Sequence, residues 1–170
     1  MLTISDASPL IALSRINQLH LLKHLFGNVI VPKGVFYELT EKGQDKAGQE
    51  QIRNASWIKS QEVRDKDFVE KLMMEGLSEV DASVIALAVE RKADIVIVDD
   101  KVVREAAKKE GLTITGTIGI IIQAKKLGLI ESVKEALDDL KQNGFWIKKK
   151  RYQEALREAK EAEEIREETP

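Results

Sequence analysis

The alternation of short apolar runs with longer helical segments is the feature that most constrains the fold of this chain. Strand-like runs occupy residues 2–5, 27–32, 57–63, 93–100 and 112–115. The segments between them have the apolar spacing of helices. Short apolar strands that alternate with helices are typical of a parallel sheet covered on both faces. We therefore expect an α/β fold, in which a twisted, mostly parallel sheet is flanked by helices.

Two helices are clear in this pattern. Residues 78–92 form the most regular one and lead directly into the strand at 93–100. The other follows the first strand over residues 8–16, where we expect Ser8 to be the N-cap. Pro9 would then be the first helical residue, a position at which its missing N–H costs nothing.

The length of 170 residues suits one α/β domain with an appendage. The composition changes at the basic run "KKKR" of residues 148–151, after which Glu dominates. We expect a main domain over residues 1–147 and a charged, solvated helical extension over residues 148–170.

Composition excludes several classes of function. The chain has no cysteine, which rules out disulfides, thiolate catalysis and cysteine-zinc sites. Its net charge of −2 argues against binding nucleic acid by bulk positive charge. No apolar run approaches the roughly 20 residues of a membrane span. The first predicted strand begins at Leu2, so we expect no signal peptide, no membrane contact and a cytoplasmic location.

Asp81 is the most informative of the acidic residues. Within the helix at 78–92 it shares the inward face with Val84, Ile85 and Ala88, at positions i, i+3, i+4 and i+7. A carboxylate on an apolar stripe needs compensation. Capping is the simpler interpretation, because Ser78 and Asp81 have the spacing of a capping box.

Other carboxylates stand where predicted strands end. Asp6 follows the first strand, and Asp99 and Asp100 follow the strand at 93–100. Glu38 lies in the helix after the second strand, on the flank of its apolar stripe. Each could also cap a helix or lie at a boundary, and spacing does not decide whether Asp99 or Asp100 faces a site.

Taken together, these acids predict a metal site. The carboxyl ends of parallel strands meet at one edge of a sheet, so the side chains are expected to converge there. Carboxylates held close together repel one another unless they are protonated or bind a cation. Oxygen ligands without His or Cys favour Mg²⁺ or Mn²⁺. Such a centre suits hydrolysis of phosphodiester bonds.

The stretches "SDASPLIALSRI", "VPKGVFYEL", "LSEVDASVIALAVE" and "IVIVDDKVVREAAKKEGLTITGTIGIIIQAKKLGLI" together resemble the PIN-domain family. The resemblance runs in order from Leu2 to about Phe145. It is nearest to a branch of predicted prokaryotic ribonucleases related to the toxins of toxin–antitoxin pairs.

The resemblance implies a PIN-like three-layer sandwich with a metal-dependent ribonuclease activity. It maps the family's acidic quartet onto Asp6, Glu38, Asp81 and the Asp99–Asp100 pair, and it places Ser8 near the metal. It also implies an RNA substrate, a possible antitoxin partner and a homodimer or higher homo-oligomer. Two departures leave the ligand set open: many branch members have a second acid beside Asp81, and here Val98 stands where a Thr often precedes the fourth acid.

We expect hydrolysis of RNA, single-stranded rather than duplex, with Asp6, Glu38, Asp81 and Asp99 as catalytic residues. The alternative is a PIN-like module that binds nucleic acid or a protein without cleaving. Lys101 and Arg104 could contact a substrate phosphate, although solvated helix charges are the simpler interpretation. The basic run at residues 148–151 could likewise contact RNA, although solvated surface charge is again the simpler interpretation. Trp146 is expected to pack rather than to stack on bases.

Overall fold

A computed structural model describes residues 1–42 and 46–161. Its centre is a parallel sheet of five strands in the order β3-β2-β1-β4-β5. The strands are β1 (Thr3–Ser5), β2 (Val29–Pro32), β3 (Ile58–Gln61), β4 (Ile95–Ile97) and β5 (Ile114–Thr115). The central strand β1 sets the register, because Thr3 pairs with Val29 of β2 on one side and with Ile95 of β4 on the other.

Helices fill the connections between these strands and follow the last one. They are α1 (Ala7–Arg15), α2 (His20–Phe26), α3 (Lys33–Thr40), α4 (Lys46–Asn54), α5 (Lys66–Met74), α6 (Glu79–Glu90), α7 (Lys101–Lys109), α8 (Thr117–Lys126), α9 (Val133–Gln142) and α10 (Lys149–Glu158). Strands and helices therefore alternate as the sequence predicts, and the fold is α/β.

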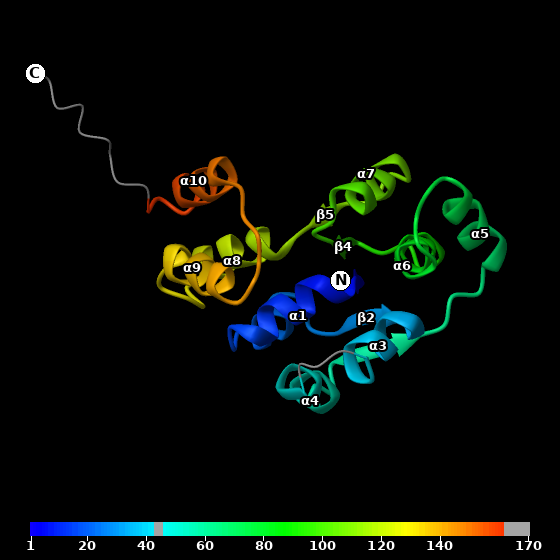
Figure 1. The fold of residues 1–170 in the computed structure, drawn as a ribbon, viewed down its shortest axis with the longest axis horizontal. Coiled ribbons are helices and arrows are strands. Elements are labelled where there is room, and N and C mark those ends of the chain that lie inside the picture. Colours follow the sequence, from blue (N-terminus) through cyan, green and yellow to red (C-terminus); the bar gives the residue numbers. More distant parts are fainter. Residues whose placement is uncertain (43–45, 162–170) are drawn as a thin grey trace, which may run out of the picture. The chain divides into compact units, whose positions relative to one another are not determined.

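The chain divides into two compact units, Met1–Thr117 and Ile118–Pro170. The first unit contains the whole sheet, and Figure 1 shows α1 and α4 on one side of the strands and α6 and α7 on the other. Helix α3 contacts α1 and α4 but also α6. Because α3 begins directly after β2, it lies at the carboxyl edge of the sheet, between the two helical layers.

The strand order creates a switch point between β1 and β4. The chain proceeds from β1 outward through β2 to β3, and then returns to β4 on the other side of β1. Loops that leave neighbouring strands in opposite directions open a crevice at their carboxyl ends, which is where open α/β sheets bind ligands. Asp6 follows β1, and its backbone N–H donates to the carbonyl of Ile97 in β4 at 3.0 Å.

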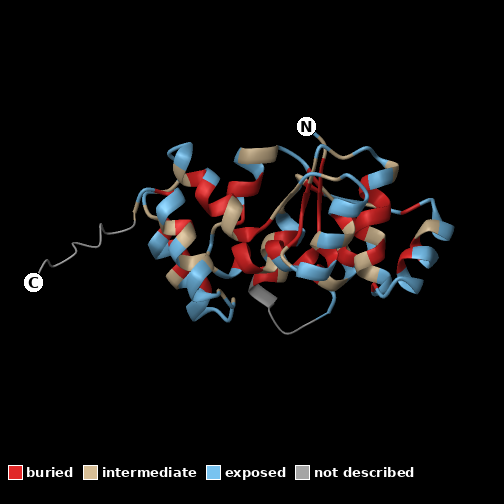
Figure 2. Cartoon of the chain, turned by 90° about the horizontal axis from the view of Figure 1, so that it is seen from above, coloured by how far each residue is buried: buried red, intermediate tan, exposed pale blue. Residues whose placement is uncertain are grey.

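The strands are the most buried part of the first unit. All three residues of β1 are buried, as are Val96 and Ile97 of β4, and Figure 2 shows the inner helix faces buried against them. The largest buried side chains are Leu and Ile, whose burial supplies the main driving force for folding. In the part of the chain that the structure describes, no helix has both the length and the apolarity needed to cross a membrane.

The N-cap expected for the first helix was wrong. Asp6, not Ser8, is the N-cap of α1: its backbone is extended, and its side chain accepts a hydrogen bond from the backbone N–H of Ala7. Both side chains can cap, but Asp6 lies directly at the end of β1. Pro9 then falls in the first turn, where a missing N–H still leaves no helical bond unmade.

Helix α5 was not predicted. Its stretch is mostly polar, but Val69 and Leu72 are buried at i, i+3 spacing and Asp65 caps its start by accepting from the N–H of Phe68. The carboxylate of Glu90 at the end of α6 accepts from the backbone N–H groups of Arg64 and Asp65 and fixes the approach to this helix.

The predicted terminal helix is shorter and less solvated than expected. Helix α10 ends at Glu158, and Lys160 has a left-handed backbone with φ of 58°. Ala155 is buried, and α10 packs against α9. Residues 162–170 of the predicted extension lie outside the described part, and the expected boundary between residues 147 and 148 stays a prediction.

Candidate active site

Asp6 is the buried member of the predicted acidic set. Only 7% of its surface is exposed, at the switch point between β1 and β4. Its pKa is raised from 3.8 to about 6, and burial is the largest cause. The hydrogen bond from the N–H of Ala7 at 2.8 Å acts in the opposite direction. The negative charges of Asp81, Glu38 and Asp99 each contribute to the rise.

All four acids of the predicted quartet take part in this electrostatic interaction, which is centred on Asp6. Asp6 comes from the end of β1, Asp99 from the segment after β4, Asp81 from the first turn of α6 and Glu38 from α3. Their sequence separations are large, and only the parallel sheet brings these segments to the same edge. Asp6 therefore lies in a field of three other carboxylates, which disfavours its ionised form.

Asp99 faces the start of α8. Its two carboxylate oxygens accept from the backbone N–H of Thr117 at 2.7 Å and from the hydroxyl of Thr117 at 2.6 Å. Burial raises the pKa of Asp99, while the Thr117 hydrogen bonds, the charge of Arg104 and a hydrogen bond with Ser8 act to lower it. The link to Ser8 places the first turn of α1 beside Asp99.

Asp100 has a different role. It is the N-cap of α7, and its carboxylate accepts from the backbone N–H groups of Val102 and Val103 at 2.9 and 3.1 Å. Asp100 is exposed, and it is not among the charges that raise the pKa of Asp6. Of the two neighbouring aspartates, Asp99 is the one whose charge acts on Asp6.

The two basic residues predicted near the substrate differ in position. Arg104 is half-buried, and its charge lowers the pKa of Asp99. Its Nη1 would lie 3.0 Å from a Cβ added at Gly116. Lys101, the first residue of α7, is exposed. Arg104 thus lies beside an acid of the site, whereas no interaction in the described residues draws Lys101 to it.

Asp81 forms only half of the expected capping box. The hydroxyl of Ser78 accepts from the backbone N–H of Asp81 at 3.1 Å, so Ser78 caps α6. In the described residues no hydrogen bond reaches the Asp81 carboxylate in return. Because the side chain is not used by the cap, it remains available to a ligand.

Glu38 borders a surface hollow. The hollow has a volume of about 320 Å³, and Tyr37, Lys33 and Lys66 also line it. Ser83 lines it from α6, two residues after Asp81. Glu38 is half-buried, and its charge acts on Asp6.

The donor set suits a hard divalent cation. Carboxylates and the hydroxyls of Ser8 and Thr117 supply oxygen only, which is the ligand chemistry of Mg²⁺ and Mn²⁺. A cation would also relieve the repulsion that raises the pKa of Asp6. As placed, no three acidic or histidine side chains among residues 1–42 and 46–161 are arranged to hold an ion. The residues therefore fit the ion in chemistry, and binding requires side-chain adjustment.

Comparison with known families decides the classification. A family model named DUF3368 and described as a PIN domain matches residues 2–161. The chain belongs to the PIN-domain family. The match spans the sheet, all of the predicted acids and helices α8 to α10. No curated protein and no solved structure matches the chain.

PIN membership supports a nuclease fold and binding of nucleic acid in general terms. Two residues of this PIN domain were missed as site residues in the sequence, Thr117 and Gly116. Thr117 was recognisable only as a helix N-cap. Its link to Asp99 crosses 18 positions and depends on β5 lying beside β4. For Gly116, the sequence offered one signal of a site: a small residue directly before the start of a helix.

Proposed function

We propose that this PIN domain is a metal-dependent ribonuclease that hydrolyses phosphodiester bonds, with single-stranded RNA as substrate. The observation that carries the proposal is the position of Asp6. It is buried at the switch point, and three other carboxylates act on its charge. Capping of α1 requires only the hydrogen bond that Asp6 accepts from the N–H of Ala7, and it does not account for three further carboxylates that act on Asp6.

Asp6, Glu38, Asp81 and Asp99 would hold one or two Mg²⁺ or Mn²⁺ ions. When bound, such an ion activates a water for attack on phosphorus and stabilises the leaving oxygen. The hydroxyl and N–H of Thr117 hold both oxygens of Asp99, which fixes the orientation of that carboxylate. No side-chain nucleophile is needed.

Arg104 suits the role of a phosphate contact. It is the cation beside Asp99, and a guanidinium can donate two parallel hydrogen bonds to a phosphate group. Ser8, exposed in the first turn of α1, could donate to the same group. We assign Lys101 a weaker, steering role, because it is exposed and lies at the start of α7.

The alternative is a PIN domain that binds nucleic acid or a protein without cleaving. One observation favours it: Asp6, Asp99 and Asp100 all accept hydrogen bonds at helix starts. A carboxylate oxygen has two lone pairs, however, so one hydrogen bond to each oxygen of Asp99 does not exclude a metal.

Cleavage assays separate the two functions. We expect the wild-type chain to cleave mixed-sequence RNA in Mn²⁺ or Mg²⁺, and not in EDTA. Asp6→Asn should abolish cleavage while the circular dichroism spectrum is unchanged. Asp67→Asn is the matched control, since Asp67 is an exposed aspartate on α5. Cleavage that survives Asp6→Asn or EDTA would refute the proposal.

The biological role proposed is that of a toxin with an antitoxin partner, acting in the cytoplasm as a homodimer or higher homo-oligomer. Its support is the resemblance of the sequence to the toxin-related branch. Within this proposal residues 1–147 are the nuclease and residues 148–170 an extension. Growth arrest on induced expression, lost with Asp6→Asn, tests the toxin role. Arrest by both forms would show that it does not depend on cleavage.

A further inference from the structure

A basic and aromatic segment lies in the second unit. Residues 141–152, "KQNGFWIKKKRY", contain five Lys or Arg and no acidic residue, although the whole chain has a net charge of −2. The segment connects the end of α9 to the first turn of α10. A local excess of cations with interspersed aromatic rings is the pattern of surfaces that bind single-stranded nucleic acid.

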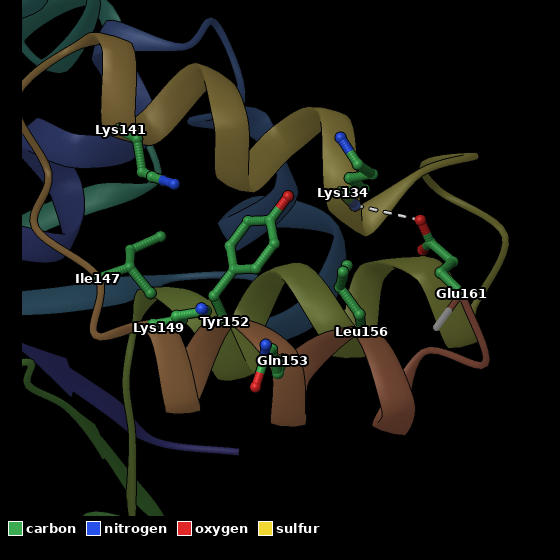
Figure 3. Close-up of a pocket in the computed structure, with 8 residues that line it drawn as sticks. All are labelled: Lys134, Lys141, Ile147, Lys149, Tyr152, Gln153, Leu156 and Glu161. Atoms are coloured by element: carbon green, nitrogen blue, oxygen red, sulfur yellow. Dashed lines mark hydrogen bonds between the residues drawn. The ribbon is translucent and has the colours of Figure 1, made fainter. Parts of the chain in front are cut away.

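A cavity of about 690 Å³ opens between these two helices. Lys141 lines it from α9, and Lys149 and Tyr152 line it from α10 (Figure 3). Ile147 and Leu156 give it apolar walls. This volume is within the range of pockets that hold a nucleotide-sized ligand.

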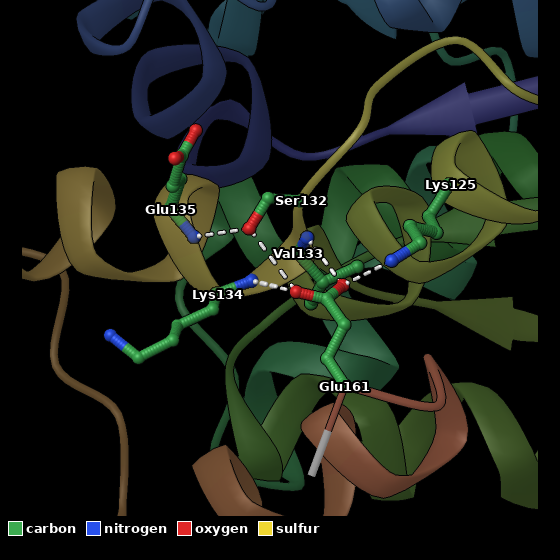
Figure 4. Close-up of polar contacts among 6 residues, drawn as sticks. All are labelled: Lys125, Ser132, Val133, Lys134, Glu135 and Glu161. Atoms are coloured by element: carbon green, nitrogen blue, oxygen red, sulfur yellow. Dashed lines mark hydrogen bonds and ion pairs between the residues drawn. The ribbon is translucent and has the colours of Figure 1, made fainter. Parts of the chain in front are cut away.

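The anions near the cavity are already engaged. The carboxylate of Asp138 accepts from Lys134 at 2.8 Å and from the hydroxyl of Tyr152 at 2.7 Å. The carboxylate of Glu161 accepts from Lys125 at 2.8 Å and from the backbone N–H groups of Val133 and Lys134 (Figure 4). These contacts fix both acids as parts of the local structure.

Lys141 and Lys149 are not held in this way, although the charge of Lys141 acts on Asp138. Among the described residues neither forms an ion pair, and Lys141 instead lies over the ring of Tyr152 at 4.7 Å. Both cations border the cavity. Two ammonium groups at one cavity, neither within ion-pair distance of a described carboxylate, favour an anionic ligand with more than one charge.

Trp146 supplies an aromatic surface next to this cavity. It is 76% exposed, so the expectation that it packs inside the protein was wrong. It directly precedes Ile147, which lines the cavity. The ammonium of Lys148 lies over the Trp146 ring, 5.9 Å from its centroid. An exposed indole beside lysines offers a flat surface on which a base can stack.

We propose that this segment binds single-stranded RNA, with phosphates on Lys141 and Lys149 and a base stacked on Trp146. The inference rests on the proposed function for the choice of RNA as the nucleic acid. Its role is to bind the substrate through residues other than the predicted acids. The combination of charge and exposed ring favours a nucleic acid over an acidic peptide, which has no base to stack.

Trp146 emission provides a direct binding test. In a Trp57→Phe background Trp146 is the sole tryptophan. With EDTA present, so that cleavage is not required, a short single-stranded RNA should quench this emission and saturate. Trp146→Ala should weaken binding of a labelled RNA about tenfold. Lys141→Gln with Lys149→Gln should lower the slope of log K against log salt by about 1.4.

Controls make each outcome decisive. Lys126→Gln is the matched variant, an exposed lysine of the second unit that does not line the cavity. It should leave binding unchanged. Unchanged RNA affinity in the Trp146 and lysine variants would overturn the inference. So would equal quenching by polyglutamate or by tripolyphosphate.

The inference and the proposed function fail separately. If the protein cleaves RNA in Mn²⁺ but Trp146→Ala binds RNA as tightly as wild type, the inference alone is overturned. RNA binding that depends on Trp146, without cleavage in any divalent metal, supports the inference and refutes the nuclease.

Discussion

Thr117 holds both carboxylate oxygens of Asp99, through its hydroxyl at 2.6 Å and its backbone N–H at 2.7 Å. The contact ties the segment after β4 to the first residue of α8. One carboxylate thus serves as a helix cap and stands among the acids that act on Asp6. The hydrogen bonds that Asp99 accepts at the start of α8 therefore do not separate it from the other predicted acids.

Removal of the Thr117 hydroxyl should affect both the stability of the protein and the pKa of Asp99. We expect Thr117→Val to destabilise the protein by about 1–3 kcal/mol, because Thr117 is fully buried and a hydrogen bond to a charged group is lost. The pKa of Asp99 should rise, because that hydrogen bond acts to lower it. Urea unfolding and the acidic limb of the pH–rate profile measure the two effects. Thr117→Ser should restore both; failure of Ser to rescue either would contradict this role.

Asp6 should destabilise the metal-free protein at neutral pH. Its pKa of about 6 in the folded state exceeds the ordinary 3.8, so the folded protein binds more protons between these values. Ionised Asp6 therefore costs about 3 kcal/mol of stability above pH 6, and the cost disappears below pH 4. In EDTA, Asp6→Asn should be more stable than wild type at pH 8 and equal to it near pH 4. A variant less stable than wild type at pH 8 would show that the carboxylate is a favourable structural group.

Gly116 leaves space that the site uses. A Cβ there would lie 2.7 Å from Oδ1 of Asp99 and 3.0 Å from Nη1 of Arg104. We expect Gly116→Ala to displace Asp99 and to reduce cleavage by at least tenfold, with a loss of stability. Gly34→Ala is the stability control, because nothing lies within 4 Å of its added Cβ. Wild-type cleavage rates in the Gly116 variant would mean that the position of Asp99 is not critical.

Glu161 should stabilise the second unit. Its carboxylate is 14% exposed and accepts from Lys125, Ser132 and two backbone N–H groups at the start of α9. Burial acts to raise its pKa, but these donors outweigh it and the pKa lies below the usual value. Its contribution is thus present above about pH 5 and lost as pH falls further.

The matching experiment replaces Glu161 by Ala. We expect the free energy of unfolding to fall by about 2 kcal/mol at pH 7 and the amides of Val133 and Lys134 to exchange faster. Glu131→Ala is the control, an exposed glutamate of the same unit. Unchanged amide exchange in the Glu161 variant would show that these hydrogen bonds do not hold α9.

The sequence predicted the fold class because strand burial and helix spacing are local. The run at residues 93–100 is Ile- and Val-rich because β4 lies inside the sheet, and the 57–63 run is more polar because β3 is an edge strand. Helix α5 escaped prediction since only Val69 and Leu72 of its mostly polar stretch are buried, which is too few to set a clear period.

The candidate site was only partly predictable, for a physical reason. A strand end shows that Asp6, Asp99 and Asp100 stand near the edge of the sheet, but not which way each side chain turns. That depends on partners distant in sequence, such as Thr117 for Asp99. The choice of Asp6 over Ser8 as N-cap is local, yet both residues can cap, so the backbone leaving β1 decides it.

Diffraction from crystals grown with Mn²⁺ tests the central claim most directly, since manganese is located by its anomalous signal. We predict an anomalous peak bound by the carboxylates of Asp6 and Asp99, with Glu38 and Asp81 as direct or water-mediated ligands. Crystals that hold Mn²⁺ elsewhere or not at all, with these four side chains unchanged from their metal-free positions, would contradict the account.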